Sequence, residues 1–248
     1  MTDQFIAHFQ QLITPARVEK LQEIFGDEPA QISNAFAASV PVVLNAVADK
    51  AGSPDGANSV LGAIHEVHGH HVMVDVDNVF SGGGDWAHKG GALLHSLLGD
   101  KEHHVSELIA GFSGAKKATV HNIMRITTLL AIDHLGSDSN VDQTDRRKLV
   151  QYLHHHADAF NTFPAGLSAT SLGLTNADAV KNKLQAHLDV MNGAGTPVAE
   201  KSKMRWIFPL LIAAGLGILL WFFFSGRNNI EDPVAPPNAP ADSIAVVH

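Results

Sequence analysis

The sequence predicts an all-α protein, an internally repeated helical domain followed by one transmembrane helix. Two observations carry this prediction. Apolar residues recur at helical spacing between capping residues, glycines and prolines through most of residues 1–192. Residues 206–224 then form a run without any charge, and an α-helix of that length matches the hydrocarbon core of a bilayer.

The chain is expected to have four parts. Residues 1–192 form a cytoplasmic all-helical domain, and residues 193–205 form a basic linker. Residues 206–224 form the transmembrane helix, and residues 225–248 form a proline-rich tail outside the cytoplasm.

The first predicted helix begins at Pro15. Thr14 is a suitable N-cap, and proline is favoured at the first helical position. Val18 and Leu21 share its apolar face, and Gly26 ends it.

A second helical stretch starts near Pro29 and runs to Gly52. Pro41 lies inside it, so we expect two helices that meet near Val40. Further helices are predicted over residues 57–65, 93–98, 105–112, 120–135, 146–160 and 177–191.

Residues 66–92 do not fit the helical pattern. Val72, Val74 and Val76 alternate with other residues as in a strand, but no second strand is available to pair with them. We therefore expect a connector, which continues into the glycine-rich loop 81–84.

The chain also repeats itself. Gly26-Asp27 and Gly99-Asp100 follow similar apolar segments, and Gly52-Ser53 corresponds to Gly136-Ser137 after an insertion of about three helical turns. The repeated blocks cover about residues 14–53 and 90–137. This pattern predicts an α-helical repeat in which neither copy buries its apolar face alone.

The two blocks carry a family resemblance. They read TPARVEKLQEIFGDEPAQISNAFAASVPVVLNAVADKAGS and GGALLHSLLGDKEHHVSELIAGFSGAKKATVHNIMRITTLLAIDHLGSD. The chain resembles the bacterial domain of unknown function 937 family, the YidB-like group, over about residues 14–175. The resemblance implies an all-helical fold and no established activity, catalytic residue or cofactor. Members with a membrane span are often followed by an OmpA-type peptidoglycan-binding domain, whereas here the proline-rich tail follows.

Charges beside residues 206–224 predict the orientation in the bacterial inner membrane. Lys201, Lys203 and Arg205 crowd the N-terminal edge, while Arg227 alone follows the other edge. Positive residues favour the cytoplasmic side, so the N-terminal domain should be cytoplasmic and the tail outside.

Particular residues of the predicted span have expected roles. Trp206 and Trp221 are suited to anchor it at the two interfaces, together with Lys203 and Arg205. Ala213 and Gly217 form a small-xxx-small pair, which allows close approach of a second helix and makes a homo-oligomer a candidate assembly.

Composition excludes some partners. The formal net charge of −8 argues against nucleic acid and against a basic lipid-binding face. The chain has no cysteine, which excludes disulfides and thiolate metal sites.

The sixteen histidines suggest one alternative chemistry. His65, His68, His70 and His71 form the densest cluster, and imidazole is a common ligand of zinc and nickel. The metalloprotease motif His-Glu-x-x-His is absent, because Gly69 stands at its last position.

The sequence predicts a non-enzymatic scaffold or protein-interaction module at the membrane, without a cofactor. No catalytic motif is recognised, and anchorage and helical repeats suit a protein partner as well as the lipid bilayer. The alternative is a histidine-dependent protein that binds or senses a transition metal such as zinc or nickel.

Overall fold

The computed structural model describes residues 4–69, 76–80, 85–138 and 145–193. The chain divides into two compact units, residues 1–197 and 198–248, and the described residues all belong to the first. The predicted span 206–224 and its tail lie outside the described residues, as do Lys203, Arg205, Trp206, Ala213, Gly217 and Trp221.

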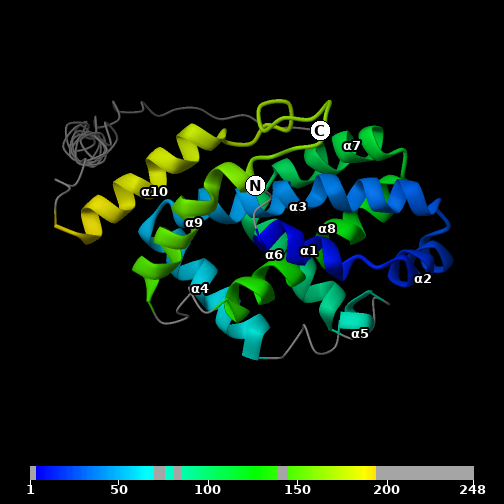
Figure 1. Ribbon diagram of the computed structural model, residues 1–248, viewed down its shortest axis with the longest axis horizontal. Coiled ribbons are helices and arrows are strands. Elements are labelled where there is room, and N and C mark those ends of the chain that lie inside the picture. Colours follow the sequence, from blue (N-terminus) through cyan, green and yellow to red (C-terminus); the bar gives the residue numbers. More distant parts are fainter. Residues whose placement is uncertain (1–3, 70–75, 81–84, 139–144, 194–248) are drawn as a thin grey trace, which may run out of the picture. The chain divides into compact units, whose positions relative to one another are not determined.

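All regular structure in the described residues is helical, which confirms the all-α prediction (Figure 1). The helices are α1 (Gln4–Leu12), α2 (Pro15–Phe25), α3 (Pro29–Ala51), α4 (Pro54–Gly69), α5 (Val76–Phe80), α6 (Trp86–Leu98), α7 (Lys101–Ser113), α8 (Lys117–Ser137), α9 (Arg146–Phe160) and α10 (Ala177–Met191).

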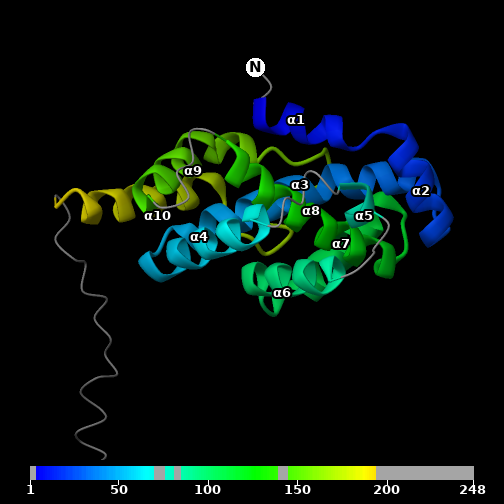
Figure 2. The same cartoon turned by 90° about the horizontal axis from the view of Figure 1, so that it is seen from below.

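Helix α3 forms the centre of the domain. It contacts α2, α4 and α6 to α10, and its contact with α8 is the most extensive between any two of these elements (Figures 1 and 2). Every residue from Ala38 to Ala48 is buried. A helix that is apolar around its whole circumference needs neighbours on all sides, and α3 has them.

The length and composition of α3 also meet the requirements of a membrane span. In the described part of the chain it is the one helix long and apolar enough to cross a bilayer. However, 72% of its most apolar stretch is buried inside the domain, so its apolar surface is already covered by protein.

The predicted break at Pro41 is wrong, because α3 continues through it. Proline lacks the N–H that would bond to the carbonyl of Ala37, and inside a helix it costs about 3 kcal/mol. Val40, Val42 and Val43 are buried on both sides of it, and burial of each such side chain contributes roughly 1.5–3 kcal/mol. Packing therefore outweighs the local penalty.

Some of the other helices have the ends predicted from local sequence signals, and some do not. α2 begins and ends as predicted, with Thr14 accepting from the Arg17 N–H and Gly26 at φ 69°. α9 and α10 have their predicted bounds, with Asp145 and Asn176 as N-caps. α4 and α6 to α8 are longer than predicted, and α1 was not expected.

The segment predicted to be a connector, residues 66–92, contains helical residues: the end of α4, the short helix α5 and the start of α6. Val76 begins the short helix α5, and the preceding residues 70–75 lie outside the described part. Hydrogen bonds in a helix are internal, so α5 needs no strand partner.

The two predicted blocks share some features and differ in others. Gly26 and Gly99 both follow a helix and have positive φ angles. The first block then has the single helix α3, whereas the second has α7 and α8 separated at Gly114. The internal repeat therefore stays a prediction.

Candidate functional site

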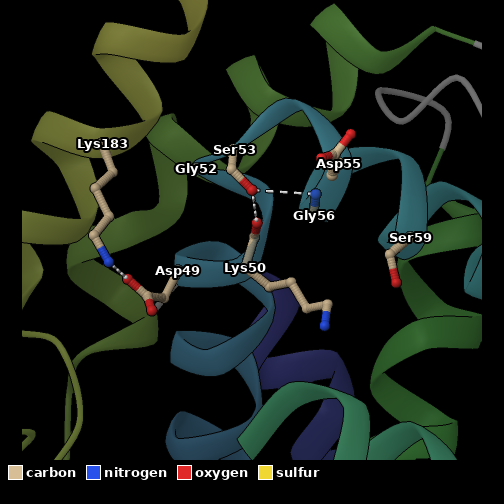
Figure 3. A pocket seen from close by; sticks show the side chains of 8 residues that line it. All are labelled: Asp49, Lys50, Gly52, Ser53, Asp55, Gly56, Ser59 and Lys183. Carbon is tan, nitrogen blue, oxygen red and sulfur yellow. Dashed lines mark hydrogen bonds and ion pairs between the residues drawn. The ribbon is translucent and has the colours of Figure 1, made fainter. Parts of the chain in front are cut away.

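One hollow lies where α3 turns into α4, but the fold uses several of its polar groups (Figure 3). It measures about 570 Å³. Lys183 forms an ion pair with Asp49, and Ser53 Oγ accepts the Gly56 N–H at 3.1 Å. Lys50 Nζ donates to the Ser96 carbonyl at 2.6 Å. Because these groups already have partners, the hollow is a structural joint between helices.

A different pocket of about 250 Å³ lies where α2, α5, α6 and α8 meet. We call it the Arg125 pocket. Most of its wall is apolar, and Arg125 is the one charged residue among those that line it. The lining residues are Ile24, Phe25, Val79, Trp86, Ala87, Asn122, Arg125, Ile126 and Leu129.

Helix α8 supplies the floor of the pocket. Its residues Asn122, Arg125, Ile126 and Leu129 are three or four positions apart, so they share one helical face. Ile126 and Leu129 are buried, and they continue this face into the core.

The guanidinium of Arg125 has no hydrogen bond or ion pair with any described residue, and its Nε is buried without an acceptor. A Cβ at Gly91 would lie 3.2 Å from Nε, 3.4 Å from Cζ and 3.5 Å from Nη2. These nearly equal distances place the guanidinium flat over Gly91. The glycine therefore leaves room for this group beside α6.

Gly90 allows α6 itself to approach α8. A Cβ at Gly90 would lie 2.8 Å from the Arg125 carbonyl oxygen and 3.1 Å from Leu129 Cδ1. The first distance is shorter than real Cβ contacts, so only glycine permits this packing.

The α5 wall of the pocket is held by Arg17. Arg17 Nε donates to Asp77 Oδ1 at 2.9 Å, and the guanidinium lies 5.5 Å from the centre of the Phe80 ring. The hydrogen bond from Arg17 and its positive charge lower the pKa of the exposed Asp77 carboxyl. Val79, between these two α5 residues, faces the pocket.

The structure brings only part of the predicted histidine cluster into a defined site. His65 is exposed on α4, whereas His68 Nδ1 lies 3.1 Å from Oδ1 of the buried Asp133 on α8. His70 and His71 lie outside the described residues. Among the residues that are described, no three histidine or carboxylate side chains are placed to hold a metal ion. The metal site therefore stays a prediction from sequence.

Ser137 also approaches His68, but the three side chains do not form a hydrolase triad. Its Oγ lies 3.4 Å from the same Nδ1 that faces Asp133. A proton relay needs the serine and the carboxylate on different ring nitrogens. The arrangement joins α4 to α8 and offers no activated nucleophile.

Sequence reasoning missed the Arg125 pocket. Two signals were present: Arg125 is the one charged residue beside Ile126 and Leu129 on its helical face, and Gly90-Gly91 forms an adjacent pair within a helical pattern. Neither feature shows that they meet, because 34 positions separate Gly91 from Arg125.

The fold and the pocket define an all-helical protein with a single arginine set into an apolar recess. Residues 8–138 match a family described as "Bacterial protein of unknown function (DUF937)", and the match covers more than half of the chain. The chain belongs to this family, as its resemblance predicted. Comparisons with curated proteins and with solved structures found no match. All residues that line the Arg125 pocket fall within the matched segment.

Proposed function

We propose that the chain is a non-enzymatic interaction module at the bacterial inner membrane and that its cytoplasmic domain binds a protein partner in the Arg125 pocket. The observation that carries this proposal is an apolar pocket whose one charged group lacks a partner among the described residues. Predicted anchorage by residues 206–224 would hold the module beside its partner.

The size of the pocket favours a side-chain anchor. Sites for small molecules usually measure about 300–1,000 Å³, whereas this pocket measures about 250 Å³. Interface hot spots are commonly single aromatic or aliphatic side chains in such pockets. Ile24, at the edge, is 47% exposed, so the apolar surface extends beyond the pocket.

The lining residues favour binding over catalysis. They carry no hydroxyl, thiol, imidazole or carboxylate group. A nucleophile or a general base would require one of these groups, or an amine of lowered pKa. An unpaired arginine can orient a charged group without further chemistry.

Photo-crosslinking in intact membranes tests the proposal. A photoreactive phenylalanine derivative replaces Ile24 in one variant and Val190 of α10, which is equally exposed at 48%, in the control. We expect a discrete crosslinked partner from position 24 and none from position 190. A further change, Ala87→Trp, fills the pocket and should abolish the crosslink. Equal crosslinking at both positions, or a crosslink that survives Ala87→Trp, would contradict the proposal.

A further inference from the structure

We infer that the Arg125 pocket selects a partner segment that carries a carboxylate beside its apolar anchor. This inference rests on the proposed function and adds the chemistry of the partner. It follows from the surroundings of Arg125 in the pocket, compared with six cations of the domain that pair with a carboxylate.

Several lysine and arginine side chains in the described part already face a carboxylate. Arg17 pairs with Asp77, Lys116 with Asp27 and Lys183 with Asp49, and similar pairs join Lys89 to Glu66, Lys117 to Glu107 and Lys181 to Asp158. Arg125 differs from all of these, because no described carboxylate faces it.

The lack of a partner for Arg125 among the described residues costs the folded domain free energy, because part of the guanidinium is buried. Its Nε–H is buried and lacks an acceptor, and a buried unsatisfied donor costs about 1–3 kcal/mol. The neighbouring walls of Phe25, Ile126 and Leu129 supply no acceptor. The two Nη groups are not buried, so a bound group with two oxygens would pair with them and gain from the apolar walls around it.

The geometry favours a carboxylate as that group. A guanidinium is planar, and its two terminal Nη groups match the two oxygens of a carboxylate. Because Arg125 lies flat over Gly91, the edge of its guanidinium is not covered by that residue. The apolar wall suits a compact single charge beside an aromatic or aliphatic group, as in an acidic residue next to Phe or Leu.

The test compares two probes that differ only in the head group, a carboxylate in 3-phenylpropionate and a neutral amide in 3-phenylpropanamide. The full-length protein carries 5-fluorotryptophan, and the fluorine signal of Trp86, in the pocket wall, is assigned with Trp86→Phe. Trp206 and Trp221, distant in sequence, serve as internal controls for non-specific binding. We expect the acid to shift the Trp86 signal at concentrations about tenfold or more below those of the amide, as a charge-assisted hydrogen bond implies.

Two variants locate the selectivity at Arg125. Arg125→Gln keeps a polar side chain but removes the charge, and it should bind acid and amide equally. Asn122→Asp places a carboxylate in the same pocket, one helical turn before Arg125, and should weaken binding of the acid about tenfold or more. A helical circular dichroism spectrum and a cooperative thermal transition like those of the unaltered protein show that each variant folds.

The outcomes separate this inference from the proposed function. Equal binding of acid and amide to the unaltered protein overturns the inference, while the partner crosslink at position 24 would still support the docking pocket. Unchanged acid preference in both variants also overturns it. Failure of both probes, together with loss of the crosslink, removes the inference and the proposed function together.

Discussion

Asp27 and Asp100 occupy corresponding places in the two predicted blocks, yet their surroundings differ. Asp27 is buried, its Oδ1 accepts the Lys116 N–H at 3.1 Å, and its Oδ2 accepts the Thr119 hydroxyl. It thereby fixes the start of α8 to the end of α2. Asp100 is exposed and makes no side-chain cap for α7.

This contrast gives the first prediction. Asp27→Ala should lower the free energy of unfolding by about 2–4 kcal/mol, because two donors lose a charged acceptor. The matched change Asp100→Ala should alter it by less than about 0.5 kcal/mol. Denaturant unfolding of the full-length chain measures the free energy of unfolding of both variants. A comparable loss in the two would show that the buried hydrogen bonds of Asp27 do not stabilise the fold more than an exposed aspartate does.

Glycine has opposite effects at two helical positions. Gly90→Ala should destabilise the protein by about 1–3 kcal/mol, because its Cβ would press on the Arg125 backbone and on Leu129. Gly62→Ala, inside α4 with no neighbouring atom within 4 Å, should stabilise it by about 0.5–1 kcal/mol. Thermal unfolding of the two variants checks the sign. If Gly90→Ala also stabilises, α6 does not need its close approach to α8.

At the scale of elements, the short helix α5 depends on a contact that acid removes. The pKa of Asp77 is lowered by Arg17, so its stabilising effect is complete above the ordinary value of 3.8. It disappears as the pH falls through the lower value in the folded state. The carboxyl is exposed, so salt weakens the effect.

Hydrogen exchange of the α5 amides tests this dependence. Protection corrected for intrinsic rates should be higher in the unaltered protein than in Asp77→Asn at neutral pH. The difference should vanish below the lowered pKa, where both side chains are neutral. A difference that persists in strong acid would mean that charge on Asp77 does not hold α5 against α2.

The elements show which parts of the fold can be predicted from sequence. The bounds of α9 and α10 were predictable because their caps, Asp145 and Asn176, act within the helix itself. Pro41 misled the prediction because its local penalty is outweighed by burial against distant helices. The Arg125 pocket could not be predicted, because it is lined by residues from four separate helices that are far apart in the sequence.

At the scale of the whole molecule, the proposed topology can be tested with single cysteines, because the chain has none of its own. Ser243→Cys, in the tail, should react with a membrane-impermeant maleimide in spheroplasts. Ser59→Cys, exposed on α4, should react only after the inner membrane is permeabilised. The reverse pattern would place the helical domain outside and contradict the orientation expected from Lys201, Lys203 and Arg205.

The central position of α3 has a consequence for synthesis of the chain on the ribosome. α3 is complete at Ala51, but its principal partner α8 is complete only at Ser137, about 86 residues later. At about 5–20 residues per second this interval lasts roughly 4–17 s. During it, a helix as apolar as a membrane span emerges without its cover, and factors that bind nascent apolar segments have time to engage it.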